Sequence, residues 1–294
     1  MQILEPVKVI VPIILIALIG YVFGRFKKTD LKTLANYIIY IGSPALALTQ
    51  LSMMKMDLRE ISLIALSAVL VILGSGLIVY LLSRAISIPF PTGLYLPVMF
   101  MNSGFIGYPL AFFALGTAGL SKAIVYDITN AILIFTLGIY LLSRGKDRWQ
   151  VLKIPFIYAA LIGLALSLSG ARMPQFIFSP LYLLGGTTIP LALFMLGSRL
   201  ADMKIAAIRL PLIASLLRLG LGLGLGYLAI LVLRLGGITA NVVILSSSLP
   251  AAVTTVALAE EYESDPELVA STIALSTLLS IVTILLVLNW MMVP

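Results

Sequence analysis

Ten apolar stretches follow one another along the chain, with only short connections between them. They cover residues 7–24, 32–51, 61–83, 94–115, 122–142, 154–169, 179–198, 211–233, 240–259 and 267–289. A helix needs about 20 consecutive apolar residues to cross the hydrocarbon core of a bilayer. The chain is 61% hydrophobic and 11% charged, whereas soluble domains are roughly half apolar and about one quarter charged. The pattern predicts an all-α polytopic membrane protein of ten transmembrane helices in a lipid bilayer, without room for a soluble domain.

The residue types that are missing exclude several kinds of chemistry. The chain has no Cys and no His, which removes thiolate nucleophiles, imidazole bases and the commonest zinc ligands. The net charge is +7, but most Lys and Arg residues flank the apolar stretches, so they indicate membrane topology and not nucleic-acid binding. We therefore expect no enzyme activity, no metal, no cofactor and no nucleic-acid partner.

The basic residues also predict how the chain is oriented. The loops after the first, third, fifth, seventh and ninth stretches carry twelve Lys and Arg residues, and the opposite side carries six. Cytoplasmic loops are the ones enriched in Lys and Arg. The prediction is a multi-pass protein of the plasma membrane with both termini on the extracytoplasmic side.

Three pairs of prolines indicate an internal repeat. The stretch 12-PIILIALIG-20 resembles 155-PFIYAALIG-163, and Pro44 and Pro109 are matched by Pro190 and Pro250, at offsets of 143, 146 and 141 residues. Five spans are an odd number, so the second half must enter the membrane upside down, which is the inverted-topology repeat of many secondary transporters. The prediction is a first repeat over 1–143, a short cytoplasmic linker over 144–153 and a second, inverted repeat over 154–294.

Two of the apolar stretches contain helix-breaking residues near their middle. These are 101-MNSGFIGYPL-110 in the fourth stretch and 246-SSSLPAAVTT-255 in the ninth. Irregular backbone at membrane depth is tolerated only where it is buried in protein or lines a wet cavity. Proline cannot continue a preceding helix, but it is well suited to the first turn of a new one. We expect one half-helix to end near Ser103 and another to start near Pro109, and Pro250 to have the same place in the ninth stretch.

Inversion makes these two broken helices run in opposite directions and cross near the midplane. Both second halves then present helix N-termini, with about half a positive charge each, to one cavity, which favours an anion. The first halves present C-terminal carbonyls, which suit a cation. The expected substrate-binding residues are Asn102, Ser103, Gly104, Gly107, Pro109, Ser247, Ser248, Pro250, Thr254 and Thr255.

Two charged residues inside apolar stretches are further candidates. Asp127, with Asn130 one helical turn later, is a candidate site for a coupling ion, either Na⁺ or H⁺, because an intramembrane charge is a functional hypothesis by default. The alternative is that Asp127 pairs with a base such as Lys122 near the interface. Arg218 neutralises a substrate carboxylate, or else it snorkels or pairs. The run 220-GLGLGLG-226 has the small-residue spacing that favours close helix packing.

The broken stretches resemble a known family. The run from Asn102 to Pro109 looks like the fourth-span crossover motif of the auxin efflux carrier family, and residues 249–283 look like its ninth and tenth spans. The resemblance implies a ten-helix fold similar to that of bile acid symporters and sodium/proton antiporters. It also implies a scaffold of spans 1, 2, 6 and 7, a transport unit of spans 3–5 and 8–10, and a homodimer like those of the plant members. The residues expected on the scaffold side of the site are Ser43, Pro44, Thr188 and Pro190.

The resemblance also implies a substrate class, because family members move auxin in plants and dicarboxylates such as malate or malonate in bacteria. The first hypothesis is a secondary transporter of small organic anions that works by alternating access. An alternative is a sodium- or proton-coupled dicarboxylate importer, and a third is a membrane receptor that does not transport. Thr254 and Thr255 stand where the family often has Asn, so the resemblance does not identify which anion is the substrate.

Overall fold

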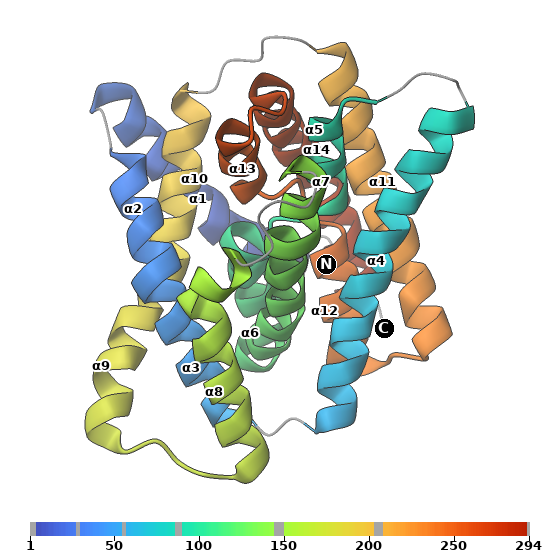
Figure 1. Ribbon diagram of the computed structural model, residues 1–294. Helices are drawn as coiled ribbons and strands as arrows, with labels where there is room; N and C mark the ends of the chain where they lie inside the picture. The colour runs from blue at the N-terminus through green and yellow to red at the C-terminus, as the bar shows by residue number, and fades with distance from the viewer. Residues whose placement is uncertain are drawn as a thin grey trace.

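The computed structural model describes residues 4–27, 30–54, 57–85, 90–143, 150–202 and 208–292. Regular structure in these ranges is helical, apart from one isolated β-bridge between Met101 and Ala251 (Figure 1). The basic residues Lys28, Lys55, Arg144, Lys146, Arg148 and Lys204, and most of the predicted linker 144–153, lie outside the described residues.

The helices of the first half are α1 (Leu4–Phe26), α2 (Leu31–Tyr37), α3 (Ser43–Met53), α4 (Leu58–Ala85), α5 (Thr92–Met99), α6 (Tyr108–Leu133) and α7 (Ile139–Ser143). Three π-helical segments adjoin them: η1 (Ile38–Gly42), η2 (Ser103–Gly107) and η3 (Ile134–Gly138). The later helices are the 3₁₀ turn η4 (Gln150–Lys153), α8 (Pro155–Ser169), α9 (Gln175–Gly186), α10 (Thr188–Asp202), α11 (Arg209–Leu233), α12 (Gly237–Ser247), α13 (Thr254–Glu261) and α14 (Pro266–Met292).

Each predicted apolar stretch falls on helical segments of this set. Within the described ranges, six helical stretches are long and apolar enough to cross a membrane. They are Val9–Phe26, Leu58–Ala85, Ser103–Ser143, Gln175–Arg199, Arg209–Leu233 and Pro266–Met291. The prediction of an all-α polytopic membrane protein is therefore confirmed in this coarser form.

The longest of these stretches is folded back on itself. Gly116 lies within α6 but has φ 67° and ψ −161°, so the chain leaves helical geometry there. Only glycine reaches such a conformation at low cost. The bend coincides with the predicted boundary between the fourth and fifth apolar stretches.

Small residues allow the helices to approach closely. A Cβ atom on Gly20 of α1 would lie 2.1 Å from the carbonyl oxygen of Phe194, and one on Gly197 of α10 would lie 1.8 Å from that of Ala17. The Ser198 hydroxyl donates to the Gly20 carbonyl oxygen at 2.8 Å. This is the small-residue packing expected between helices in a membrane, where lipid is as apolar as Leu.

Two groups of neighbouring helices stand out in the packing. α1 packs along α10, and α3 packs against α8 and α9. α11 packs against α4, α12 and α14, and α12 packs against α6. Large apolar side chains such as Ile19, Leu183 and Leu286 point outward from both groups and are more than half exposed, as expected of surfaces that face lipid.

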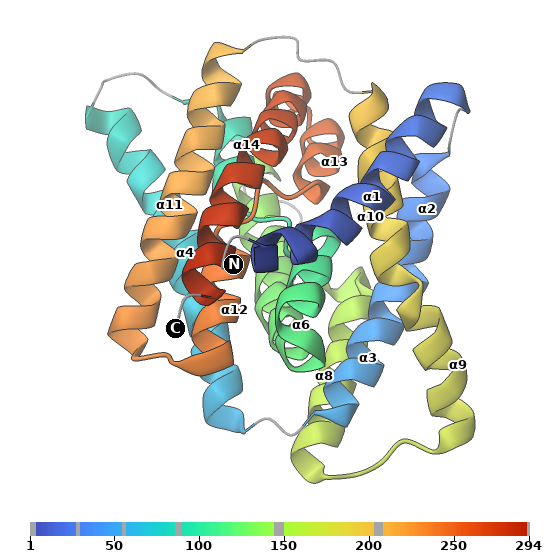
Figure 2. The same ribbon diagram turned by 180° about the vertical axis from the view of Figure 1, so that it is seen from behind.

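The helix ends alternate between two edges of the molecule. In Figure 1 and in the reverse view of Figure 2, α1, α4 and α10 end at the upper edge, and α3, α8 and α11 end at the lower edge. The short helices α5 and α13 lie in the upper half of both views and α12 lies in the lower half.

The positions of the two helix breaks differ from the prediction. The first half-helix does not reach Ser103, because α5 ends at Met99 and an extended residue, Phe100, follows it. The new helix begins at Ser103 and not at Pro109, because the Asn102 side chain caps its first turn by accepting a hydrogen bond from Phe105 N at 3.2 Å. The next turn is π-helical, so its hydrogen bonds reach back five residues and not four. The turn therefore does not need an N–H donor from Pro109.

Pro250 does not correspond to Pro109 in the structure. It lies in the non-helical segment after α12, four residues before α13 begins at Thr254. Its fixed φ angle suits extended backbone, and its carbonyl is free to accept a hydrogen bond from another chain segment. The expectation that Pro250 starts a helix was therefore wrong.

Candidate functional site

The two broken helices meet at their breaks, where backbone hydrogen bonds join them, and we call this region the crossing. Asn102 N donates to the Pro250 carbonyl oxygen at 2.9 Å, and Ala252 N donates to the Phe100 carbonyl oxygen at 3.0 Å. These two bonds form the antiparallel bridge between Met101 and Ala251. Each break thus satisfies backbone groups of the other, which removes much of the cost of irregular backbone in a membrane.

Two new helices begin at this crossing. η2, which continues into α6, starts at Ser103, and α13 starts at Thr254. In the described part of the chain, the backbone N–H groups of Gly104 and Thr254 have no hydrogen-bond partner. Such free donors at helix N-termini favour a negatively charged group nearby.

A cavity of about 110 Å³ lies beside these helix starts. Its lining comes from the crossing, from α6 and η3, and from η1, α3, α8 and α10 on the opposite side. The lining residues are Ile38, Ile39, Ser43, Met101, Asn102, Ser103, Gly104, Phe105, Asp127, Asn130, Ala131, Ile134, Phe135, Ile154, Phe156, Thr188, Ala192, Ala252 and Thr254.

Half of the residues expected at the site line this cavity. They are Asn102, Ser103, Gly104, Thr254, Asp127, Asn130, Ser43 and Thr188. The others, which are Gly107, Pro109, Ser247, Ser248, Pro250, Thr255, Pro44 and Pro190, are not part of its lining. The hydroxyls of Ser247, Ser248 and Thr255 are buried and donate to carbonyls three residues earlier in their own segments, so they are already satisfied.

The apolar part of the lining was not expected from the sequence. Ile38 and Ile39 come from η1, and Ile134 and Phe135 come from η3. The π-helical turn η1 precedes Pro44, which has no N–H to donate. In this turn Ser43 N donates to the carbonyl oxygen of Ile38, five residues earlier. The position of Pro44 was a usable signal for this irregular turn, whereas nothing in the sequence marks η3.

Asp127 lies in the cavity wall and is hydrogen-bonded by neutral groups. The Ser103 hydroxyl donates to Asp127 Oδ1 at 2.5 Å, and the Tyr108 hydroxyl donates to Oδ2 at 2.6 Å. Asn130 Nδ2 in turn donates to Ser103 Oγ at 2.8 Å and to the Met101 carbonyl oxygen at 2.9 Å. Asp127 and Asn130 therefore belong to one hydrogen-bond network, with Ser103 between them.

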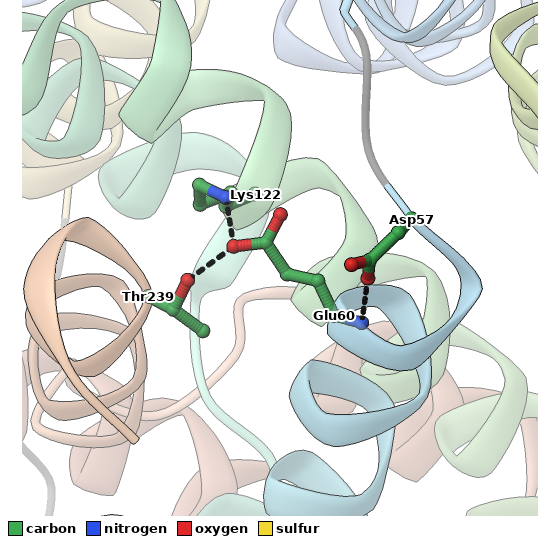
Figure 3. A network of polar contacts seen from close by, with 4 residues as sticks. All are labelled: Asp57, Glu60, Lys122 and Thr239. Carbon is green, nitrogen blue, oxygen red and sulfur yellow. Dashed lines mark hydrogen bonds and ion pairs between the residues drawn. The ribbon is translucent and has the colours of Figure 1, made fainter.

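The alternative in which Asp127 pairs with Lys122 is wrong. Lys122 Nζ instead contacts Glu60 Oε1 at the start of α4, and the Thr239 hydroxyl donates to the same oxygen at 2.5 Å (Figure 3). Asp57 accepts a hydrogen bond from Glu60 N at 2.6 Å. This cluster joins the starts of α4 and α12 to the middle of α6, and it leaves Asp127 without a salt bridge among the described residues.

Three buried polar atoms at the cavity lack a hydrogen-bond partner. They are Asn102 Nδ2, Asn130 Oδ1 and Thr188 Oγ1, and each of their residues is 2% exposed. A buried polar atom left without a partner costs about 1–3 kcal/mol. The residues that carry these atoms come from three different elements, and all three line the cavity.

Arg218 is also buried, but it lies away from this cavity. Nη1 donates to the carbonyl oxygens of Val98 and Met99, and Nη2 donates to that of Ser247. Of the roles predicted for Arg218, the structure shows pairing, and the partners of Arg218 are backbone carbonyls. Neither snorkelling nor contact with a substrate in the cavity fits this position.

Among the described residues, no three His, Cys, Asp or Glu side chains come together in a way that could hold a metal ion.

Comparisons with known proteins agree with a transport role. Residues 139–288 match a family described as membrane transport protein. An uncharacterised transporter of Methanocaldococcus jannaschii is 28% identical over 96% of this chain and 97% of its own. Another, from Methanothermobacter thermautotrophicus, is 31% identical over 94% of this chain and 95% of its own. The chain therefore belongs to the membrane transport protein family, the auxin efflux carriers that its fourth-span motif resembles.

Proposed function

We propose that the protein is a secondary transporter of small organic anions, and that the cavity at the crossing is its substrate site. The observation that carries the proposal is the set of three unpartnered polar atoms, on Asn102, Asn130 and Thr188, around one cavity. A protein that only needed to pack would have no reason to bury them, because each costs free energy until a ligand satisfies it. The same feature argues against a receptor that uses only its surface.

The charges at the cavity support an anion. The helix starts at Ser103 and Thr254 each bring a partial positive charge and a free N–H group. Asn102 Nδ2 adds a side-chain donor. Asn130 Oδ1, an acceptor, suits a hydroxyl or a protonated second carboxyl of the same molecule.

The size of the cavity favours a small carboxylate. An engineered apolar cavity of 150 Å³ in another protein holds benzene, and this cavity measures about 110 Å³. A three- or four-carbon dicarboxylate fits such a volume better than the two fused rings of indole-acetate. Malonate and malate are therefore the first substrates to test.

Asp127 supports the coupled version of this function. An ionised carboxylate in the cavity wall repels an anionic substrate, whereas a protonated or cation-bound carboxyl does not. Binding of H⁺ or Na⁺ at Asp127 then favours binding of the anion, which is the requirement for cotransport. A coupled dicarboxylate importer is thus the specific alternative to an uncoupled organic anion carrier.

We extend the proposal to the architecture, with ten spans in two inverted repeats over 1–143 and 154–294. The crossing of α5–α6 with α12–α13 supports it, as do the two packing groups described above. The group of α1, α3, α8, α9 and α10 corresponds to the scaffold, and the group of α4, α6, α11, α12 and α14 to the moving, elevator-like unit. Plasma-membrane location, extracytoplasmic termini and a homodimer belong to the same proposal.

The test uses purified protein in liposomes on a solid-supported membrane. Malonate, malate, indole-acetate and other small carboxylates are screened for currents, with radiolabelled exchange for electroneutral cases. Thr188→Val, which removes an unpartnered hydroxyl, should reduce substrate affinity while the unfolding temperature stays the same or rises. The matched control is Thr49→Val, whose hydroxyl is buried but bonded to Ala45 O at 2.7 Å; it should leave affinity unchanged. No carboxylate transport in either assay, or an unchanged affinity in Thr188→Val, would overturn the proposal.

A further inference from the structure

One guanidinium group joins the ends of both broken helices. Arg218 Nη1 lies 2.9 Å from Val98 O and 3.0 Å from Met99 O, in the last turn of α5. Nη2 lies 2.7 Å from the carbonyl oxygen of Ser247, the last residue of α12. The side chain is 0% exposed, so these carbonyls take the place of water at its two terminal nitrogens, whereas Nε has no hydrogen-bond partner among the described residues.

The charges at this contact balance. The C-terminus of a helix carries about half a negative charge, so two such ends together match one guanidinium. No carboxylate forms a salt bridge with Arg218 within the described ranges, and an unbalanced charge inside a membrane protein is costly. The carbonyl ends of α5 and α12 are therefore its counter-charge.

The backbone around this contact is shaped to admit it. A Cβ atom on Gly222, one turn after Arg218, would lie 2.1 Å from Ser247 O and 2.3 Å from Arg218 Nη2. One on Gly226 would lie 2.0 Å from Ser247 Oγ. By contrast, Gly220 and Gly224 of the same run meet nothing within 4 Å. The run 220–226 thus keeps one face free of side chains where α12 ends against α11.

In transporters with broken helices, unwound carbonyls and half-helix C-termini commonly coordinate Na⁺. We propose that Arg218 is the resident cation of this crossing, a positioning residue that holds both carbonyl ends and takes the place of a coupling sodium ion there. The positive helix starts then stay uncompensated on the cavity side, where an anion binds. The next step rests on the proposed function. Because Arg218 occupies the carbonyl ends where a sodium ion would bind, the coupling ion is a proton at Asp127.

The first test measures the unfolding temperature of the purified full-length protein and does not depend on transport. Arg218→Ala removes the cation and should lower this temperature by roughly 10 °C. Methylguanidinium chloride at millimolar concentration should restore part of the loss, whereas choline chloride at equal ionic strength should not. Arg209→Ala, an exposed arginine on the same helix α11, is the matched control and should show neither effect.

Two further variants cover the case in which Arg218→Ala does not fold. Arg218→Lys keeps the charge but has no planar fork to reach both helix ends, so it should fold with an intermediate unfolding temperature. Gly222→Ala pushes Ser247 away from Arg218 and should lose stability that methylguanidinium does not restore, because the space remains filled. A wild-type unfolding temperature in Arg218→Lys and Gly222→Ala would overturn the assignment, as would an Arg218→Ala variant that folds but does not respond to methylguanidinium.

The second test measures transport by the wild-type protein in sodium chloride and in choline chloride at the same pH. Equal rates are expected, and a rate more than twofold higher in sodium would overturn the proposal. A protein that moves no carboxylate but whose Arg218→Ala variant is rescued by methylguanidinium would refute the proposed function and leave the role of Arg218 standing. The two failures are therefore distinguishable.

Discussion

Substitution of Asn102 tests the proposed anion site, because the two polar atoms of its side chain have different partners. Oδ1 caps η2 through Phe105 N, and Nδ2 is buried at the cavity without a partner. Asn102→Asp keeps the shape and the capping oxygen but replaces the donor with a negatively charged oxygen. The variant should therefore retain its helix start and lose affinity for an anion.

The size of the loss follows from Coulomb's law. Two like charges about 4 Å apart repel by about 4 kcal/mol at an effective dielectric constant of roughly 20, which is nearly a thousandfold in affinity. Asn102→Ser, which removes the donor without adding charge, should cost only about tenfold, the value of one hydrogen bond to a charged group. Acidification should restore much of the affinity of Asn102→Asp, because a protonated carboxyl carries no charge and regains a donor.

The measurement is calorimetric titration with malonate, or with whichever carboxylate the current screen selects. Unfolding temperature and gel filtration identify preparations that are still folded. If folded Asn102→Asp binds the anion within tenfold of the wild type at neutral pH, the carboxylate does not sit near Asn102 and the reasoning from the helix starts fails. A loss as large in Asn102→Ser would also contradict it, since charge would then not be the cause.

Three other substitutions test separate parts of the structure. Asp127→Asn should make transport independent of pH while leaving anion binding within a few fold, and a retained pH dependence would show that the proton binds elsewhere. Glu60→Gln removes the partner of Lys122, which is 8% exposed, and should lower the free energy of unfolding by about 2 kcal/mol. The loss is smaller than the roughly 3–5 kcal/mol of a fully buried pair, because Glu60 is 29% exposed. Thermal unfolding of Glu60→Gln, with and without Lys122→Met, checks this, and the double variant should be the more stable of the two. Pro109→Ala should leave transport within twofold because the helix already starts at Ser103, and a large loss of current would contradict the observed position of the break.

The apolar stretches predicted the helices well, because twenty apolar residues in a row have few other solutions in water or in lipid. The break near Asn102 was also predicted, since Asn, Ser and Gly together oppose a continuous helix. The sequence does not predict the exact limits of this break, because the preference of proline for the first turn of a helix points to Pro109, and the helix starts at Ser103. In fact a side-chain cap and a π-helical turn define the start after Asn102, and hydrogen bonds between distant segments fix the extended residues.

The site was predicted only in part, for a related reason. Asn102, Asp127 and Asn130 could be found because polar residues are rare in such stretches. Ser247 and Ser248 looked equivalent to them in sequence, but their hydroxyls bond within their own helix. Nothing in the sequence separates Ile134 or Phe135 from the many apolar residues that face lipid. The role of Arg218 depends on two helix ends that are more than a hundred residues apart in the chain.

The bridge between Met101 and Ala251 restricts the alternating access that we propose. The two backbone hydrogen bonds of the bridge join the two helix breaks. Arg218 also joins them, because it donates to carbonyls at the ends of both α5 and α12. The cavity therefore cannot open by separating one break from the other. In the transport cycle that we propose, the opposite wall, to which Ser43 and Thr188 belong, slides past the crossing, and a bound anion travels with the crossing.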